Sequence, residues 1–341
     1  MKNIYFADCN INSVNLENNE KLAVLELQKN KINGLDLSQC KALENLNLSE
    51  NKLYSIKLSE NKNLKSLDLS HNKIESIDLS QQSLNRLNLA SNDLTQIDLA
   101  NKKSLRTLDL SDNYLSVLSF DTMNLKSLNL ADNLFQNLRL PGISFSGYDN
   151  LDLNFSDNKS LSSIQYNGSI ENLWKLNITN TKLGKMLAYI PEMTQLKDLD
   201  ADNCNANIDR LEFRSQILKE ISVNDNRIKE LRFNDCPELA RIEAKNNPIA
   251  IVDINNSFKL ESFNIPYSNS IWHQELLEIC RENNLAKSES EKEKIMEDDE
   301  IEQDKDKDKG WNWNIILLVI IAIGVWVKLS NVLVIKDNNN Q

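Results

Sequence analysis

Apolar and polar positions follow one pattern that returns about every 21 residues over roughly the first 270 residues of the chain. The pattern, L-x-x-L-x-L-x-x-N-x-L, is clear at Leu64, Leu67, Leu69, Asn72 and Ile74. Its fourth and sixth positions are apolar and alternate with polar residues, which is typical of a short strand with one buried face. So short a unit leaves no room for a full helix, and we expect the remainder of each unit to be extended or 3₁₀.

The pattern divides this part of the chain into about thirteen units. They begin at Met1, Leu22, Leu43, Leu64, Leu84, Leu105, Leu125, Asn150, Leu173, Leu196, Leu218, Leu239 and Leu260. The ninth position is usually Asn, and its substitutes are Cys9, Thr181, Cys204 and Ser268. An Asn side chain both donates and accepts hydrogen bonds, so we expect this column to satisfy buried backbone groups between successive turns.

These residues and their spacing resemble the leucine-rich-repeat family, specifically the short 21–22-residue class of bacterial internalin-like and SDS22-like proteins. The resemblance covers about four fifths of the chain. It implies an α/β-type repeat solenoid, a curved horseshoe with a parallel β-sheet on its concave side and a mostly extended or 3₁₀ convex side. It also implies protein–protein recognition, although a fold by itself identifies no partner.

The chain changes character after the repeats. We expect a solenoid over residues 1–270, a capping helix over 271–286, a charged linker over 287–310, a transmembrane anchor over 311–335 and a polar tail over 336–341. The cap is predicted because Trp272, Leu276, Ile279 and Cys280 recur at helical spacing. Such a helix would cover the apolar end of the last repeat.

Residues 311–335 are predicted to form a single membrane-spanning helix. The run from Ile315 to Val327 is apolar and uncharged, and Trp311, Trp313 and Trp326 suit the two membrane interfaces. The alternative is a buried core helix or a dimerisation helix. Because no secretion signal is visible at the start, we expect a tail anchor with the repeats in the cytosol.

Charge and composition narrow the function. The net charge of −11 argues against a nucleic-acid partner. The five cysteines lack paired spacing, so no disulfide framework is expected. The two histidines have no nearby nucleophile, metal-ligand partner or glycine-rich phosphate loop in the sequence. We therefore expect no enzymatic activity, no cofactor and no metal.

The candidate partner-binding residues lie on the expected concave sheet, where the third, fifth and seventh positions of each unit should face solvent. They are Asp152, Lys175, Asp198, Asp200, Asp202, Glu220, Arg241 and Lys245, with Phe145 and Tyr148 on a loop above them. Clustered carboxylates suit a basic partner. The alternative is a merely solvated acidic face.

Two functions fit these features. The first is a membrane-anchored scaffold that binds a protein partner through the concave face. The alternative is an exported bacterial leucine-rich-repeat effector or internalin-like adhesin that acts on a host protein or membrane. A third possibility, an enzyme regulated by repeats, lacks a second domain to hold the chemistry.

Overall fold

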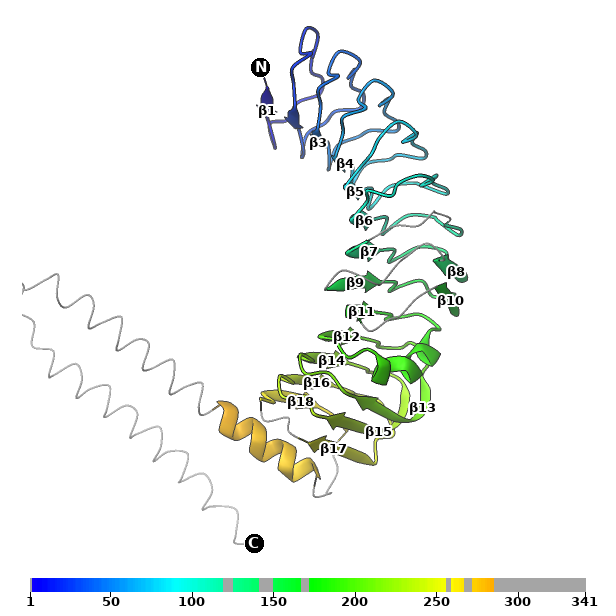
Figure 1. Cartoon of the computed structure of the whole chain (residues 1–341), viewed down its shortest axis with the longest axis vertical. Helices are drawn as coiled ribbons and strands as arrows, with labels where there is room; N and C mark the ends of the chain where they lie inside the picture. The colour runs from blue at the N-terminus through cyan, green and yellow to red at the C-terminus, as the bar shows by residue number, and fades with distance from the viewer. Residues whose placement is uncertain are drawn as a thin grey trace, which may run out of the picture. The chain divides into compact units, whose positions relative to one another are not determined.

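The computed structural model describes residues 2–118, 125–140, 150–166, 172–255, 259–266 and 272–284. All of them belong to the first of the chain's two compact units, which ends at Asn284. This unit is a curved solenoid whose main sheet follows the inside of the curve (Figure 1).

The main sheet has thirteen parallel strands, one in each of the units that the pattern defines. In sheet order they are β1 (Asn3–Tyr5), β2 (Val24–Glu26), β3 (Asn45–Asn47), β4 (Ser66–Asp68), β5 (Arg86–Asn88), β6 (Thr107–Asp109), β7 (Ser127–Asn129), β9 (Leu151–Asn154), β11 (Leu173–Asn177), β12 (Asp198–Asp200), β14 (Glu220–Ser222), β16 (Arg241–Glu243) and β18 (Ser262–Asn264). Equivalent residues pair across neighbouring strands, as Leu67 does with Leu46 and Leu87. The predicted parallel concave sheet is confirmed.

The core is a stack of apolar columns from the first, fourth, sixth and eleventh positions. In the fourth unit, Leu64, Leu67, Leu69 and Ile74 are all buried, whereas Asp68 between them is only half-buried. The alternation of buried and solvent-facing side chains is what a pleated strand on a core requires. Each unit therefore contacts mainly its neighbours, and the core is continuous along the solenoid.

The ninth-position Asn forms a ladder of hydrogen bonds between units. The Asn72 Nδ2 donates to the carbonyl oxygens of Leu48, one unit earlier, and Leu69, at 2.9 and 3.0 Å. Its Oδ1 accepts the backbone N–H of Leu53 at 2.9 Å. The same arrangement recurs at Asn51 and Asn113. Buried backbone groups at the turn are thus satisfied by one side chain, as expected for this column.

The eighth position, just before the ladder, adopts a left-handed backbone. The residues with positive φ there are Asp8, Lys29, Glu50, His71, Ser91, Asp112, Asp132, Asp157, Asn180, Asn203, Asp225 and Asn246. Most are Asp or Asn, which tolerate this region better than other L-residues. A left-handed residue thus follows each of the first twelve strands of the main sheet.

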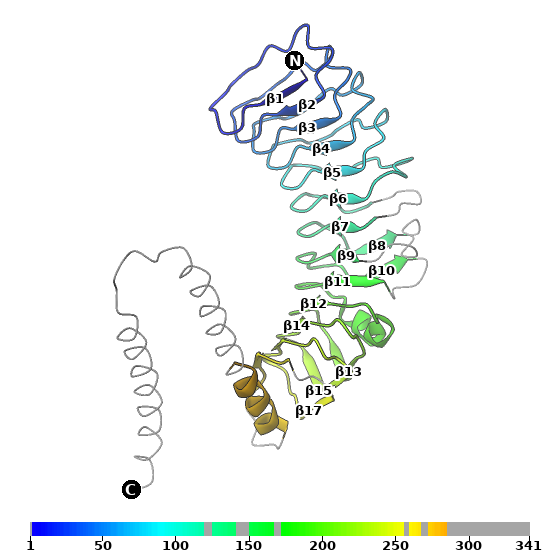
Figure 2. The ribbon, with the colours of Figure 1, turned by 60° about the vertical axis from the view of Figure 1, so that its left-hand side comes forward.

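The convex side contains structure that the sequence pattern did not predict. A two-stranded parallel sheet pairs β8 (Asn137–Leu140) with β10 (Ser163–Tyr166), and a three-stranded one joins β13 (Asn207–Phe213), β15 (Arg227–Asn234) and β17 (Ile251–Asn255). Figure 2 shows β8 and β10 to the right of β9 and β11 of the main sheet. The 3₁₀ helix η1 (Gly184–Glu192) agrees with the predicted convex geometry. It begins at glycine because a Cβ on Gly184 would lie 2.4 Å from the backbone nitrogen of Ala206.

Residues 272–284 form a helix next to the last strands. Leu276 and Cys280 are buried on it. The Asn283 Nδ2 donates to the carbonyl oxygen of Leu260 at 2.7 Å, and the Trp272 Nε1 donates to that of Ala250 at 3.1 Å. These contacts place the helix over the end of the solenoid core.

No helix within the described ranges is long and apolar enough to cross a membrane. The predicted linker, anchor and tail, residues 287–341, lie outside those ranges.

Replacing Asn72 by Ala should lower the free energy of unfolding by about 2–4 kcal/mol, because the buried N–H of Leu53 and the carbonyl groups of Leu48, Leu69 and Ser70 lose their side-chain partner. The measurement is chemical unfolding followed by circular dichroism. Asn63→Ala is the control, since the exposed Asn63 side chain makes one surface hydrogen bond. Equal losses in the two variants would show that the ladder does not stabilise the turns.

Candidate functional site

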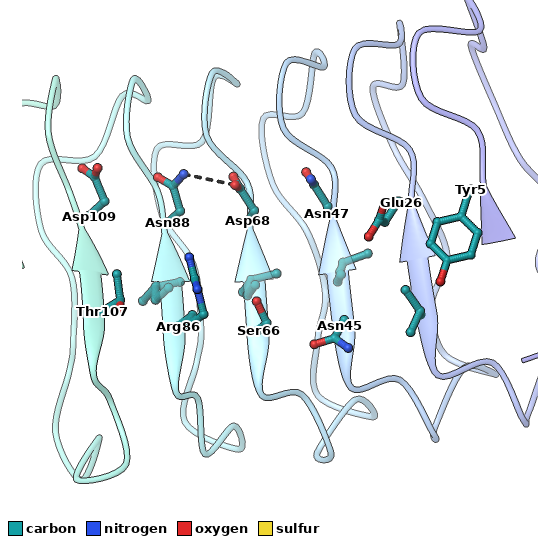
Figure 3. A pocket seen from close by; sticks show the side chains of 14 residues that line it. Tyr5, Glu26, Asn45, Asn47, Ser66, Asp68, Arg86, Asn88, Thr107 and Asp109 are labelled. Atoms are coloured by element: carbon teal, nitrogen blue, oxygen red, sulfur yellow. Dashed lines mark hydrogen bonds between the residues drawn. The ribbon is translucent and has the colours of Figure 1, made fainter. Parts of the chain in front are cut away.

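The concave sheet carries two shallow depressions. The first, of about 650 Å³, extends from Tyr5 on β1 to Asp109 on β6 (Figure 3). The second, of about 470 Å³, extends from Asp109 across β7, β9, β11 and β12 to Glu220 on β14. Both are open to solvent, so the chemistry of the lining side chains decides what each can bind.

In the first depression, the fifth-position side chains are used by the fold itself. The Asp68 Oδ1 accepts the backbone N–H and the hydroxyl of Ser70, and its Oδ2 accepts Nδ2 of Asn88 at 3.1 Å (Figure 3). Asp109 makes the same bonds to Ser111 and Asn129. These carboxylates close the turn at the end of each strand, which makes them poor candidates for partner binding.

The same turn contact extends through seven consecutive units. Its acceptors are Asn47, Asp68, Asn88, Asp109, Asn129, Asn154 and Asn177, each bonded to the backbone N–H two residues later. The series stops at Asp200. Within the described residues, the Asp200 carboxylate has no hydrogen bond or ion pair.

The second depression brings together most of the acidic residues singled out from the sequence. Across four strands, Asp152, Lys175, Asp198 and Glu220 lie in register, and Arg241 follows on β16. The Lys175 Nζ lies 2.8 Å from Oδ2 of Asp198, and this hydrogen bond is the main reason that the pKa of Lys175 is raised. Five carboxylates and one ammonium line the depression.

Two of these carboxyl groups have pKa values above the usual range for Asp. Burial is the main cause at Asp152, whose Oδ1 is buried without a hydrogen-bond partner. At Asp200 burial is again the main cause of the raised pKa, and the negative charges of Asp202, Asp198 and Glu220 add to it. Glu220, like Asp200, has no ion pair within the described residues. The depression therefore holds negative charge that the protein itself does not neutralise.

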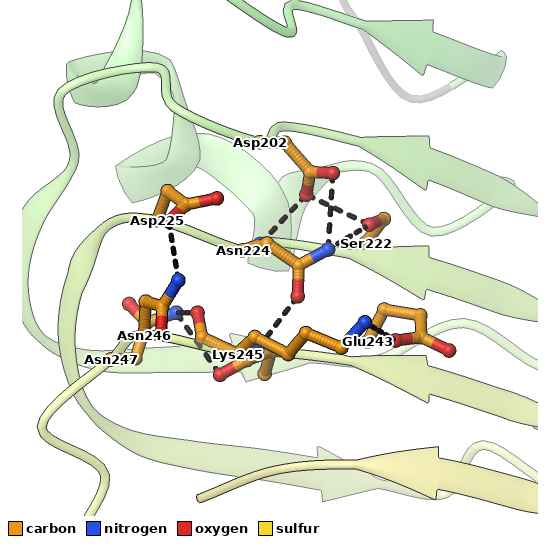
Figure 4. Close-up of polar contacts among 9 residues, drawn as sticks. Asp202, Ser222, Asn224, Asp225, Glu243, Lys245, Asn246 and Asn247 are labelled. Atoms are coloured by element: carbon orange, nitrogen blue, oxygen red, sulfur yellow. Dashed lines mark hydrogen bonds and ion pairs between the residues drawn. The ribbon is translucent and has the colours of Figure 1, made fainter.

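Asp202 does not line the depression. Its Oδ1 accepts the hydroxyl of Ser222 and the backbone N–H of Asn224, both at 2.7 Å, and its Oδ2 accepts Nδ2 of Asn224 at 3.1 Å (Figure 4). Lys245 also lies at this turn, where its backbone N–H donates to Oδ1 of Asn224 and its Nζ lies 4.0 Å from Glu243. Asp202 is thus a structural residue of the turn.

The expectation that seventh-position side chains face the concave solvent is wrong for several units. Ser49, Ser70 and Ser156 are buried there, because the left-handed eighth residue has already begun to turn the chain away from the sheet. The two aromatic residues expected above the site, Phe145 and Tyr148, lie outside the described residues.

Sequence reasoning missed several residues of this site. Asn129, Asn154 and Asn177 line the depression between the charged positions. Trp174 lies beside Lys175, and its ring centroid is 5.2 Å from Nζ of Lys197. Lys197 follows Trp174 in the column that precedes the third position, since its backbone N–H donates to the Trp174 carbonyl oxygen. Tracing that column through the repeat would have found this pair.

The convex sheet offers a contrast in how charges are arranged. There Asp209 lies 2.7 Å from Lys229 and Glu230 lies 2.9 Å from Arg210. The hydrogen bond from Lys229 holds the pKa of Asp209 below its usual range. Carboxylates on the convex side are paired across strands, whereas Asp200 and Glu220 on the concave side are not.

No group of three or more His, Cys, Asp or Glu side chains within the described ranges could hold a metal ion. The cysteines are all free thiols, and burial raises the pKa of Cys204 to about 12. His71 is exposed, and His273 packs edge-on against Phe263.

Solved structures show which fold this geometry belongs to. The leucine-rich-repeat domain of APL1B matches 77% of this chain and 80% of its own length, with 19% identity and a TM-score of 0.57. YopM, a leucine-rich effector protein from Yersinia pestis, matches 72% of this chain and 66% of its own, with 18% identity and a TM-score of 0.52. This chain has the leucine-rich-repeat fold.

A functional domain of InlJ from Listeria monocytogenes matches 78% of this leucine-rich-repeat chain at 19% identity, with a TM-score of 0.46. The match spans 64% of that domain, so this chain covers less than two thirds of its length. No protein-family model and no curated protein sequence matches the chain.

Replacing Asp200 and Asp202 separately by Asn should change the stability of the leucine-rich-repeat solenoid in opposite directions. Because the pKa of folded Asp200 is raised, its ionised form destabilises the fold at neutral pH, and this effect disappears as pH falls through the folded pKa. Asp200→Asn should therefore raise the melting temperature modestly. Asp202→Asn should lower the free energy of unfolding by about 1–2 kcal/mol, since two charge-assisted hydrogen bonds weaken and an amide N–H₂ faces Asn224.

Thermal unfolding of both variants at neutral pH checks this pair of outcomes. Similar destabilisation by Asp200→Asn would mean that Asp200 also supports the fold.

Proposed function

We propose that this protein is a membrane-tethered binding module that docks a basic segment of a partner protein in the acidic depression of its concave face. The docking site consists of Asp152, Asp198, Asp200 and Glu220, with Lys175 between them. The leucine-rich repeats supply a rigid surface, and the partner supplies the missing cations.

The observation that carries this proposal is the unpaired state of Asp200 and Glu220. In seven preceding units the fifth position closes its own turn, and on the convex sheet the carboxylates face cations of the next strand. The fold therefore has ways to neutralise such charges and does not use them here. Unpaired carboxylates in a partly desolvated wall favour a cationic ligand, because their repulsion is relieved only by an opposite charge.

The geometry favours a partner segment, extended or helical, that carries two cationic side chains. Lys175 occupies the middle of the depression and already binds Asp198, so the remaining negative charge is divided between Asp152 on one side and Asp200 with Glu220 on the other. Neighbouring strands lie about 4.8 Å apart, which places the two regions roughly 10 Å from each other across β11. Two cations at that spacing along one segment would satisfy both.

Structures with the same fold support a binding role without identifying the ligand. The LRIM1/APL1C complex matches 97% of this chain and 70% of its own length, with 16% identity and a TM-score of 0.52. In that structure LRIM1 and APL1C form a complex, which is consistent with a protein partner here.

The tether is supported by sequence alone. Residues 311–335 are predominantly apolar, are interrupted only by Lys328 and a few polar residues, and carry tryptophans near both ends of the uncharged run. We expect the repeats to remain on the cytosolic side. A tether of this kind would confine docking to partners at the same membrane.

The docking site can be tested with short peptides that carry lysine or arginine. The double variant Asp200→Asn/Glu220→Gln should weaken peptide binding to the full-length protein about ten-fold, since two attractive charges are lost. The measurement is fluorescence anisotropy at several salt concentrations, and the variant should also show a flatter salt dependence. Asp209→Asn/Glu212→Gln on the convex sheet is the matched control and should bind normally.

Lowering the pH provides a second readout for the same complex. The raised pKa values of Asp152 and Asp200 mean that these groups take up protons at higher pH than ordinary carboxyls, so affinity should begin to fall there. Binding that is unaffected by the double variant, or equally reduced by the convex control, would rule out this depression as the docking site.

The tether predicts that the full-length protein stays in the membrane pellet through an alkaline carbonate wash. Replacing Ile320 and Ile321 by Lys should release it into the supernatant, because two charges at the centre of a spanning helix oppose insertion. Release of the unaltered protein by the same wash would contradict a membrane-spanning segment.

A further inference from the structure

A second charged surface lies along the loops that lead into the concave strands. The described stretches 59–66, 80–86 and 100–107 contain five cationic residues besides the buried Lys102, and one carboxylate, although the whole chain carries a net charge of −11. That carboxylate, Glu60, lies 3.9 Å from Lys41 and is therefore already paired. Lys126 follows at the place equivalent to Arg106 in the next unit. We call this surface the basic margin, and it consists of Lys62, Lys65, Arg86, Lys103, Arg106 and Lys126.

Backbone hydrogen bonds place these residues in columns along one flank of the solenoid. The N–H of Asn85 donates to the carbonyl oxygen of Lys65, that of Arg106 to Asn85, and that of Lys126 to Arg106, at 2.7–2.8 Å. The Arg106 Nη1 lies 3.3 Å from the carbonyl oxygen of Lys103, which brings the second column beside the first. Arg86 lies at the start of β5, at the lower edge of the depression in Figure 3.

Most of these six cations project into solvent. Lys62, Lys65, Arg86 and Lys103 are exposed, and within the described residues none of these four side chains has an ion pair. The acidic residues on the same strands, Asp68 and Asp109, lie at the opposite strand ends and are hydrogen-bonded to Ser70 and Ser111. Glu44 is the carboxylate next to Lys65 in the first column, since the N–H of Lys65 donates to the carbonyl oxygen of Glu44. Beyond Lys65 the charges of the basic margin are all positive, and they repel one another unless an anion faces them.

The composition of the basic margin distinguishes among anionic partners. Protein interfaces are depleted in Lys at their centre and anchored by apolar or aromatic side chains, and no large exposed hydrophobic residue belongs to the basic margin. Single-stranded nucleic acid requires stacking aromatics, and the stretches 59–66, 80–86 and 100–107 contain no Phe, Trp or Tyr. Clusters of four to eight Lys and Arg without apolar anchors are typical of surfaces that meet anionic lipid headgroups.

From these observations we infer that the basic margin rests on the anionic surface of a membrane and orients the repeats against it. This inference rests on the membrane tether proposed above, which would hold the solenoid close to such a surface. With one flank on the bilayer, the concave acidic depression remains open to a partner. Anionic lipid in the same leaflet would also keep the basic margin away from the acidic depression of neighbouring molecules.

The opposite flank supplies a matched control. Lys31, Lys52 and Lys73 are exposed there and form their own column, since their backbone N–H groups donate to Ile11, Ile32 and Leu53. On that flank the acidic residues Glu50 and Glu75 are interspersed with the lysines. Both sets consist of exposed lysines but lie at opposite ends of the strands, and in the control set the Lys73 Nζ also lies 3.5 Å from the Tyr54 hydroxyl.

The test uses the full-length protein with vesicles of phosphatidylcholine alone or mixed with phosphatidylserine. Lysines are modified by an amine-reactive reagent, and the rate at each position is measured by mass spectrometry. Modification of Lys62, Lys65 and Lys103 should be roughly five-fold slower on phosphatidylserine vesicles, a factor typical of one cation near an anionic surface. Lys31, Lys52 and Lys73 should react equally on both vesicles, and high salt should abolish the difference.

Charge reversal at the basic margin gives an independent readout. The variant Lys62→Glu/Lys65→Glu/Lys103→Glu should lose the phosphatidylserine-dependent protection of Lys126, whereas Lys31→Glu/Lys52→Glu/Lys73→Glu should keep it. All six positions are exposed, so both variants should fold.

The failures of tether and basic margin are distinguishable by flotation. If the protein floats with neutral vesicles but the two lysine sets react alike on phosphatidylserine, the basic margin does not contact lipid and the inference is overturned. If the protein does not float with neutral vesicles, the tether fails. In that case the protein is tested with phosphatidylserine vesicles. If it floats with them and the basic-margin variant does not, the lipid contact is supported. If neither protein floats, the lipid contact is overturned. Protection by an acidic protein without any effect of lipid would also overturn it.

Discussion

The asparagine ladder is the interaction on which the rest of this solenoid depends. Every strand of the main sheet is short, and after each of the first twelve the chain leaves the sheet through a left-handed residue. That turn buries carbonyl and N–H groups that no sheet partner can reach. One amide, such as that of Asn72, reaches both its own unit and the preceding one, so the same side chain closes the turn and joins neighbouring units. Where Thr181 replaces Asn, its hydroxyl still bonds the Ile178 carbonyl and the Leu183 N–H.

The turn also determines which concave residues are available for binding. Because it recruits the fifth-position side chain as well, Asp68 and Asp109 are part of the scaffold despite their position on the binding face. In the tenth unit Asp202 takes hydrogen bonds from the following unit, and Asp200 is left without a partner. An acidic cluster that is uniform in sequence therefore separates into structural and available carboxylates.

Much of the fold follows from the sequence because each unit repeats the same local problem. Strand positions, the buried Leu columns and the role of Asn72 are all consequences of period and side-chain chemistry. The convex sheets are less accessible to this reasoning, since β13, β15 and β17 lie in units of ordinary length, which begin at Leu196, Leu218 and Leu239, and nothing in their spacing sets these units apart. The difference between Asp200 and Asp202 is also invisible in sequence, because it depends on Ser222 and Asn224 in the next unit. Which charges pair across strands depends on the register of the strands, and the register is seen only in the structure.

The basic margin and the acidic depression give the repeats two oppositely charged surfaces on adjoining parts of one sheet. The margin comes from residues just before the strands, and the depression comes from residues within them, so both are set by position in the repeat. Such an arrangement allows one surface to orient the solenoid while the other binds a partner, without any change in the fold.

The central claim is that Asp200 is an available carboxylate on a binding face. The most direct measurement is the titration of individual Asp carboxyl carbons by nuclear magnetic resonance, with Asp209 as an internal reference. The account predicts that the pKa of Asp200 lies above that of Asp209 in the free protein and falls when a lysine- or arginine-containing peptide is added. An Asp200 pKa at or below that of Asp209, unchanged by the peptide, would contradict it.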